Sequence, residues 1–166
     1  TTENAVPCGN MVEIWAGSAR IVLGEGAGLR YYPAGEKLPQ KHQLLIQFDD
    51  SSSLIGSVQM YRGLWAFPAG QFENPYYLIA KRKPSPLTDE FNYAHFESLL
   101  ADEKLESLSV KAFLATEQRI PGLGNGVLQD ILWTARIHPR RKLATLSDRE
   151  LRVLFNSVKC VLKEMA

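Results

Sequence analysis

The sequence predicts an α+β protein in which an antiparallel β-sheet or partial sandwich is followed by a bundle of helices. Short β-rich runs such as MVEIWA and ARIVLG, separated by the turn signal Gly17-Ser18, occupy roughly residues 10 to 68. From about Thr88 onward, apolar residues recur at helical spacing instead. Between the two parts, AKRKPSPLTDEF has the cations and prolines that are typical of a linker. We therefore expect a β-rich N-terminal domain at residues 1–83 and a helical domain at residues 84–166.

The expected strands are bounded by turn residues. LRYY follows a glycine-rich stretch and is closed by a Pro-Ala-Gly turn, and GLWAF ends at another Pro-Ala-Gly. HQLLIQF and SLIGSVQMY flank Asp49-Asp50-Ser51, which predicts a hairpin. We interpret Asp49 and Asp50 as turn residues rather than as a catalytic pair of carboxylates.

Helices are expected throughout the second half. One begins near Thr88, and Ser109 is placed to cap a second. In the last helix, Ser147 and Glu150 form the pattern of a capping box. The remaining helix follows a group of glycines, and its apolar stripe consists of Val127, Leu128, Ile131, Leu132 and Ala135.

Composition limits the classes of protein that the chain can belong to. Its 166 residues are 45% hydrophobic and 22% charged, as in an ordinary globular protein. No apolar run reaches the length of a transmembrane helix, so we expect no membrane partner. Cys8 and Cys160 lie far apart without metal-binding spacing, which argues against zinc and for a reducing, cytoplasmic compartment. The chain starts at Thr1 without an initiator methionine, and we expect it to be a fragment.

A basic segment lies between Ile131 and Leu146, although the net charge is only +1. The segment contains no acidic residue, and such local patches matter more than the net charge for binding a polyanion. Its cations form either a solvated face or a set of phosphate contacts, and the sequence leaves both open. They are Arg136, Arg140, Arg141 and Lys142, with His138 among them.

Two other residue types receive a structural interpretation. His138 precedes Pro139 at a predicted helix end, so we expect it to cap carbonyl groups rather than to bind a metal. Trp15, Trp65 and Trp133 are expected in the core rather than as platforms that stack on bases.

The stretch RIPGLGNGVLQDIL, residues 119–132, places three glycines before a helix. Such a loop forms either a tight turn or a phosphate cradle, because backbone N–H groups at the positive end of a helix dipole bind anions. No Gly-Lys-Ser/Thr follows and no long β-strand precedes, which excludes a P-loop and a dinucleotide-binding fingerprint. The spacing by itself favours the plain turn.

The residues around this loop resemble those of a known family. IPGLGNGVLQDILWTARIHPRRKLATLSDREL is similar to the helix-two-turns-helix segment of the formamidopyrimidine-DNA glycosylase and endonuclease VIII family. There a Gly-x-Gly-Asn turn opens a helix that ends in an A-G-I-H-P-like element, followed by LSDEEL, and KPSPLTDEF resembles the family's PEPLSDEF linker. The resemblance covers about residues 10 to 165 and is strong from Pro84 onward. The matching residues are Gly122, Gly124, Asn125, Leu132, Ala135, Ile137, His138, Pro139, Leu146 and Ser147.

The resemblance implies base-excision DNA repair. Family members bind duplex DNA, flip a damaged base out of the stack, cut its glycosidic bond and then nick the backbone. Their helix-two-turns-helix holds the DNA backbone through N–H groups and an Asn side chain. Lys111 in SVKAFL stands at a DNA-contacting lysine of the family, and His42 in KHQLLIQF stands at a DNA-contacting histidine. We expect a damaged or abasic duplex as partner, with DNA contacts from His42, Arg62, Lys111, Gly122, Gly124, Asn125, Arg136 and Arg141.

The resemblance also implies the chemistry, which this chain does not carry. The family's nucleophile is the amine of an N-terminal proline, which forms a Schiff base with the sugar, whereas this sequence begins Thr1-Thr2-Glu3. The family's zinc finger would lie beyond residue 166, so we expect no zinc or other cofactor within the chain. We expect the intact protein to be a DNA glycosylase with AP lyase activity. The 166-residue chain is expected to be an inactive monomer without catalytic residues that binds DNA weakly.

The segments that would meet the lesion differ from the family pattern. Val22 stands at a family histidine, and Glu25 stands at the methionine that fills the space of the flipped base. VQMYRGLW keeps the glycine and tryptophan of the family's DPRRFGAW loop but not its Arg-Phe wedge, for which Arg62 or Tyr61 can substitute. Together with Met60, these substitutions favour an alternative hypothesis, a non-catalytic DNA-binding or scaffold protein that retains the fold.

Overall fold

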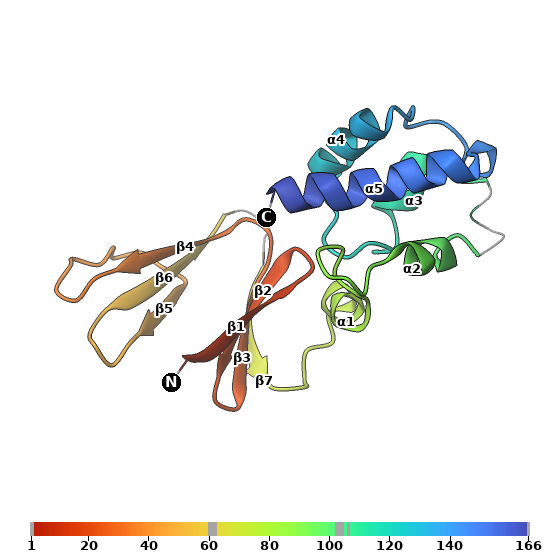
Figure 1. Ribbon diagram of the computed structural model, residues 1–166. Coiled ribbons are helices and arrows are strands. Elements are labelled where there is room, and N and C mark those ends of the chain that lie inside the picture. Colours follow the sequence, from red (N-terminus) through yellow and green to blue (C-terminus); the bar gives the residue numbers. More distant parts are fainter. Residues whose placement is uncertain (1, 60–62, 102–104, 106, 166) are drawn as a thin grey trace. The chain divides into compact units, whose positions relative to one another are not determined.

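A computed structural model describes all residues of the chain except 1, 60–62, 102–104, 106 and 166 (Figure 1). The chain divides into two compact units, residues 1–73 and 74–166. The first contains the strands and the second contains the helices, so the predicted α+β class is confirmed. The domain limits expected from the linker composition, 1–83 and 84–166, stay a prediction. No helix in the described part of the chain has both the length and the apolar character needed to cross a membrane.

Unit 1 consists of two antiparallel sheets. One has the strand order β1-β2-β3-β7 and the other has the order β4-β6-β5. The described strands are β1 (Thr2–Cys8), β2 (Met11–Ala16), β3 (Ala19–Leu23), β4 (Ala27–Tyr32), β5 (Leu44–Gln47), β6 (Ser53–Val58) and β7 (Leu64–Pro68).

Strands β2 to β7 lie where the sequence predicts them, whereas β1 lies before the expected sheet. Its sequence, TENAVPC, has no clear alternation of apolar and polar residues, and it contains Pro7. A proline removes one ladder donor, which an edge strand tolerates. β1 is indeed at an edge, where it pairs with β2 through a turn at Gly9 and Asn10.

The predicted turn at Asp49-Asp50-Ser51 is confirmed. The Ser52 N–H and hydroxyl both donate to Oδ1 of Asp50, at 2.9 and 2.6 Å. These bonds, the hydroxyl first, hold the pKa of Asp50 below its usual value. The Phe48 N–H donates to the Ser52 carbonyl at 2.9 Å, and this bond closes the loop. Asp50 therefore shapes the turn, as predicted.

The tryptophans of unit 1 are half-buried and pack against neighbouring strands. Trp65 lies over Gly63 so closely that a Cβ at Gly63 would overlap its ring. The Gly63 carbonyl accepts a 2.8 Å hydrogen bond from the Gly24 N–H. On the neighbouring strand, the Arg20 guanidinium stacks on the ring of Trp15 and pairs with the buried Glu13 at 3.6 Å. Packing of the Trp65 ring against the backbone therefore explains why residue 63 is a glycine.

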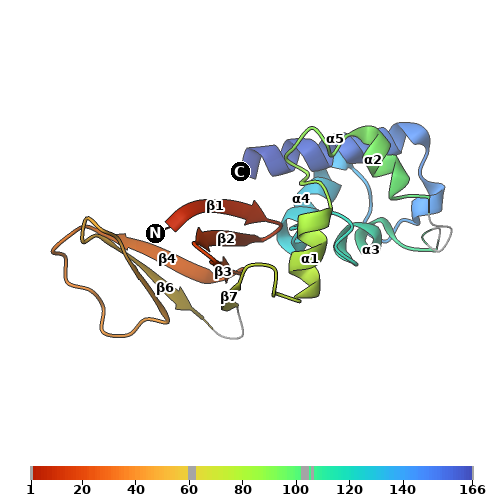
Figure 2. The same ribbon diagram turned by 90° about the horizontal axis from the view of Figure 1, so that it is seen from below.

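Unit 2 is built around one apolar core. Leu128 and Ile131 of the long central helix and Leu154 and Val158 of the last helix are fully buried in this core. These two helices, α4 and α5, lie side by side in both views (Figures 1 and 2). The helices are α1 (Pro75–Arg82), α2 (Tyr93–Ser98), α3 (Val110–Ala115), α4 (Asn125–Ala135) and α5 (Asp148–Met165), with a 3₁₀ turn, η2 (Leu143–Thr145).

Two helix boundaries differ from the sequence prediction. Lys81 and Arg82, expected in a linker, end α1, which begins at the cap Asn74 and Pro75. This signal is readable in the sequence, because Asn is a preferred cap and proline suits the first helical position. The helix expected near Thr88 begins only at Tyr93.

The later start of α2 has a local cause. Asn92 is its cap, and the Asn92 side chain accepts a 2.9 Å hydrogen bond from the His95 N–H. Thr88 instead donates its hydroxyl to the Ser85 carbonyl at 2.9 Å, within a turn that contains Pro86. The predicted cap Ser109 is confirmed, since its hydroxyl accepts from the Ala112 N–H at 3.2 Å.

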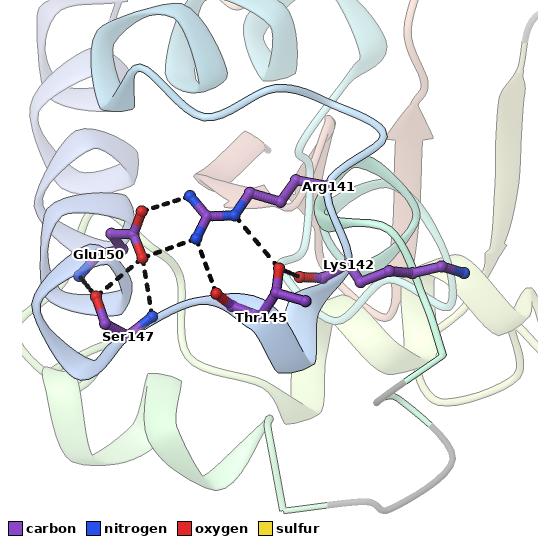
Figure 3. Close-up of polar contacts among 5 residues, drawn as sticks. All are labelled: Arg141, Lys142, Thr145, Ser147 and Glu150. Atoms are coloured by element: carbon purple, nitrogen blue, oxygen red, sulfur yellow. Dashed lines mark hydrogen bonds and ion pairs between the residues drawn. The ribbon is translucent and has the colours of Figure 1, made fainter.

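The start of α5 carries the predicted capping box, enlarged by an arginine (Figure 3). The Ser147 N–H and hydroxyl both donate to Glu150, at 2.9 Å, and the Ser147 hydroxyl accepts from the Glu150 N–H at 3.4 Å. Arg141 forms a two-pronged ion pair with the same carboxylate. Its guanidinium also donates to the carbonyl and hydroxyl of Thr145, at 2.8 and 3.3 Å. Arg141 thereby ties the loop before α5 to the first turn of that helix.

This cluster makes unit 2 sensitive to acid. The hydrogen bonds from Arg141, followed by those from Ser147, lower the pKa of Glu150 from 4.5 to about 2. A carboxyl group whose pKa is lowered by folding stabilises the fold above its unfolded pKa. That contribution is lost as the pH falls from about 4.5 toward 2.

We predict that Glu150→Gln flattens the acid limb of the stability profile. Urea unfolding of the chain, followed by circular dichroism between pH 7 and pH 2, measures the free energy of unfolding. In the native sequence this free energy falls below pH 4.5, and the variant should show a smaller fall because the titrating group is gone. Glu97→Gln, which removes a carboxylate outside this cluster, is the matched control. Equal acid limbs for the native chain and Glu150→Gln would contradict the assignment.

Candidate nucleic-acid interface

The first glycine of the loop before α4 is explained by backbone geometry. Gly122 has a φ of 82°, a left-handed conformation that residues with a Cβ adopt only with strain. Its N–H donates to the side-chain carbonyl of Gln118 at 3.4 Å. Gly122 therefore forms a turn, and this geometry requires no ligand.

The N-terminus of α4 differs from that of the other helices. Gly124 is the N-cap, and no side chain in the described part of the protein caps the helix. In the other described α-helices, a first-turn N–H is bound by the side chain of Asn74, Asn92, Ser109 or Ser147. The first N–H groups of a helix have no partner within the helix itself. Those of α4 are thus available to an external acceptor.

Two further glycines keep this N-terminus open. A Cβ added at Gly124 or Gly126 would meet no atom within 4 Å, and neither residue has a positive φ. The fold therefore requires a glycine at neither position. Gly126 lies inside the helix, where glycine is less stable than alanine by about 0.5–1 kcal/mol. Such a glycine is typical of a site where a ligand approaches the backbone closely.

Exposed side chains complete this end of α4. Asn125 is the first residue of the helix, and its side chain is exposed. Its amide can donate to an oxygen held over the N–H groups. Gly122, Gly124 and Asn125, three of the predicted site residues, therefore lie together at one end of one helix.

Lys111 and Arg136, two other predicted residues, meet at the opposite end of α4. The Lys111 N–H donates to the Pro139 carbonyl at 3.2 Å, and the Val110 N–H donates to the Arg141 carbonyl at 2.9 Å. These bonds hold the segment after α4 against α3. Lys111 and Arg136 line one groove and are exposed. No ion pair of either side chain is found among the described residues.

Arg136 occupies an unusual backbone position. It is the C-cap of α4, with φ 55° and ψ 37°, and the Ile137 N–H donates back to the Leu132 carbonyl at 3.0 Å. This left-handed position is usually a glycine, because a Cβ there costs about 1–2 kcal/mol. The chain thus holds an exposed cation at a position where glycine would be more stable.

The remaining predicted residues lie apart from these two groups. Arg141 is engaged in the ion pair with Glu150, so the structure gives it a structural role rather than a free guanidinium. His42 is exposed in unit 1, with Nδ1 3.1 Å from the Pro39 carbonyl. Arg62 lies outside the described residues, as do Met60 and Tyr61. Their contacts with DNA stay predictions.

The basic segment divides into engaged and free cations. Arg141 binds Glu150, and the Lys142 ammonium donates to the Ser107 carbonyl. Arg140 is exposed like Arg136. Part of the segment is therefore structural, while the rest stays available for phosphate.

The expected role of His138 needs correction. Its ring does not cap a carbonyl; instead, Nδ1 accepts a 3.2 Å hydrogen bond from the Arg140 N–H. The ring is exposed. Over the described residues, no three metal-ligating side chains converge. The expectation that zinc is held only beyond residue 166 stays a prediction.

The expected core position of Trp133 is wrong, because its side chain is 85% exposed. The buried stripe of α4, with Leu128, Ile131, Leu132 and Ala135, faces the core, and Trp133 projects from the other side of the helix. It lines a groove of about 870 Å³. The groove is formed by Lys111, Leu128, Gln129, Leu132, Trp133, Arg136, Ile137, His138 and Pro139.

Trp133 and Gly126 are the functional candidates that the sequence analysis missed. Both signals were present in the sequence. Trp133 does not share the helical spacing of the buried stripe, and Gly126 follows the N-cap by two positions and is therefore inside the helix.

Comparison with known proteins places the helical part in a family. Residues 83–166, just over half of the chain, match the family model described as the formamidopyrimidine-DNA glycosylase H2TH domain. The chain is 28% identical over 151 residues to the formamidopyrimidine-DNA glycosylase of Photobacterium damsela subsp. piscicida, covering 88% of this chain and 52% of the relative. It is 30% identical over 122 residues to that of Lactococcus lactis subsp. cremoris, covering 72% and 43%. The chain thus spans about half the length of the curated relatives it matches.

Solved structures show the same fold. The formamidopyrimidine-DNA glycosylase of Lactococcus lactis, bound non-covalently to DNA containing an AP site, has a TM-score of 0.77 at 23% identity, covering 99% of this chain and 63% of that one. Its complex with DNA containing FAPY-dG has a TM-score of 0.78 at 22% identity, covering 99% and 62%. With the match to the family model, these findings show that the chain belongs to the formamidopyrimidine-DNA glycosylase H2TH family.

Proposed function

We propose that the intact protein is a base-excision repair DNA glycosylase with AP lyase activity, and that this chain grips damaged or abasic duplex DNA by its phosphates. One observation carries the proposal: the uncapped N-terminus of α4, opened by Gly124 and Gly126. The relatives are named as glycosylases of this kind, and structural neighbours are described as complexes with AP-site or FAPY-dG DNA. These names favour the repair enzyme over the non-catalytic scaffold.

The phosphate contact is a direct consequence of helix geometry. The N-terminus of α4 carries a partial positive charge and N–H groups that point outward. A phosphate oxygen there accepts from the backbone, and the amide of Asn125 adds a donor from the side. Such contacts position DNA without reading its sequence. A repair protein needs this property, because lesions occur in any sequence.

The second contact lies at the other end of α4. Lys111 of α3 and Arg136 at the C-cap of α4 present exposed cations to one groove, and duplex DNA carries phosphates at regular spacing on each strand. His42 and Arg62 are proposed to contact the DNA from unit 1. Arg141 acts indirectly, by fixing the loop that leads from Arg136 to α5.

The lyase step needs an amine that attacks C1′ of the abasic sugar. The neutral amine adds to the aldehyde form, water leaves, and the resulting iminium makes elimination of the 3′ phosphate possible. The resemblance assigns this amine to a terminal proline of the intact protein. Within the chain, the pKa of Lys83 is lowered by burial, and its ammonium donates to the Gln118 carbonyl at 3.0 Å. Lys83 is therefore the amine to replace first if the chain itself reacts.

We predict that Gly126→Ala raises the stability of the chain and lowers its affinity for DNA. The methyl group meets no atom of the protein, and alanine should raise the free energy of unfolding by up to about 1 kcal/mol. The same methyl group obstructs a phosphate at the helix N-terminus, so affinity for an abasic duplex should fall about fivefold or more. Urea unfolding and fluorescence anisotropy measure the two effects.

The matched control for this variant is Gly122→Ala. At a φ of 82° the added Cβ is strained, so this variant should lose stability. If Gly126→Ala binds DNA with unchanged affinity, the loop is a plain turn and the phosphate site is wrong.

Arg136→Gly is likewise predicted to raise the stability of the chain and to lower its affinity for DNA. Glycine relieves the left-handed position and should stabilise the chain by about 1 kcal/mol. Loss of the cation should lower DNA affinity and reduce the slope of log K against log salt by about one. Arg149→Ala, which removes an exposed charge from α5, is the control for net charge. Equal effects of the two variants on the salt slope would rule out a specific phosphate contact.

Borohydride trapping on an abasic duplex tests the catalytic proposal. The full-length protein should form a covalent adduct, because borohydride reduces the iminium to a stable amine. The 166-residue chain should bind the duplex without an adduct. No adduct with the full-length protein would refute lyase activity. An adduct with the chain that disappears in Lys83→Ala would assign the nucleophile to Lys83 and refute the expected inactivity.

A further inference from the structure

We propose that the groove beside Trp133 binds an unstacked nucleobase of a DNA strand, with the indole as stacking platform and Lys111 and Arg136 holding the adjoining phosphates. The proposal rests on the proposed function, since it requires that DNA lie along α4. It adds a contact with a base to contacts that otherwise reach only the phosphates.

The first step is the unusual exposure of the indole. Trp133 is 85% exposed, whereas Phe91, Phe96 and Phe113 of the same unit are fully buried in its core. Its exposure follows from the helix, because the buried stripe of α4 lies on the other side. A planar aromatic surface at a helix end can stack on any base, since every base has a π-face.

The second step is the chemistry of the groove walls. Leu132, Ile137 and Pro139 provide an apolar floor, while Lys111 and Arg136 are the charged groups. No acidic side chain is among the lining residues in the described part; Asp130 lies on α4 beside Gln129 but outside this lining. An apolar surface with a cationic rim is complementary to a base and its phosphate. A purely apolar protein segment would leave these cations without partners.

The third step is the position of the groove relative to the glycine loop. Gly126, Gln129 and Trp133 are exposed at spacings that place them on one face of α4. The seven residue steps from Gly126 to Trp133 span about 10 Å of helix, or about three nucleotides of one strand. A strand whose phosphate binds at Gly126 therefore reaches Trp133 with a base a few nucleotides away. The groove has a volume of about 870 Å³, which is within the usual range of small-ligand pockets.

Titration of the 166-residue chain with an eight-nucleotide thymidine strand tests the proposal. Thymine stacking should quench the tryptophan emission, and the quenching should be absent in Trp133→Phe, whose two remaining tryptophans are half-buried. Trp133→Ala should lower affinity for the strand about fivefold or more, and Trp133→Phe should recover part of it. Tyr76→Ala, which removes another exposed aromatic residue from unit 2, is the matched control and should bind normally.

The possible outcomes distinguish failure of the base site from failure of the proposed phosphate binding. If the chain binds an abasic duplex, and Trp133→Ala binds the thymidine strand as the native chain does, the base site is refuted while the phosphate site stands. If neither DNA binds, both are refuted. A lowered melting temperature of Trp133→Ala would show that the indole is packed in the fold, which also overturns the proposal.

Discussion

The packing of α4 on α5 is the interaction on which the candidate interface depends. Leu128 and Ile131 meet Leu154 and Val158 in a fully buried layer, and this layer fixes the rotation of α4 about its axis. Once that rotation is set, the face with Gly126 and Trp133 must point outward. Because the layer contains only apolar side chains, it holds the helix without drawing on the polar groups at either helix end.

The N-termini of α4 and α5, the two long helices of unit 2, differ in how they are capped. The N-terminus of α5 is closed by Ser147 and Glu150 and reinforced by Arg141, whereas the N-terminus of α4 is left open. A side-chain cap stabilises a helix by about 1 kcal/mol, and a glycine inside a helix destabilises it by up to about 1 kcal/mol. The cap of α5 holds the loop that leads from Arg136 to that helix. The capped end therefore stabilises α5, whereas the open end of α4 lies where the phosphate is proposed to bind.

Local signals made much of this fold predictable. The capping box at Ser147 depends on residues within one turn, so it is readable from spacing alone, and so is the buried stripe of α4. The partner of Arg141 was not predictable, because Glu150 lies nine residues away across a loop and pairs only after the chain has turned. Trp133 was misassigned because tryptophan is usually buried, and composition outweighed its position on the helix. The α1 helix was missed because its cations suggested a linker.

The three loop glycines show what sequence spacing cannot distinguish. All three fit a turn before a helix, but only Gly122 has the positive φ that makes glycine necessary. Gly124 and Gly126 have ordinary φ values and open space around the missing Cβ, so an added Cβ would meet no steric obstacle at either position. Gly126 weakens the helix that carries it, and neither its φ nor the packing around it requires a glycine. A close approach of a phosphate to the exposed N–H groups supplies a reason for a glycine there.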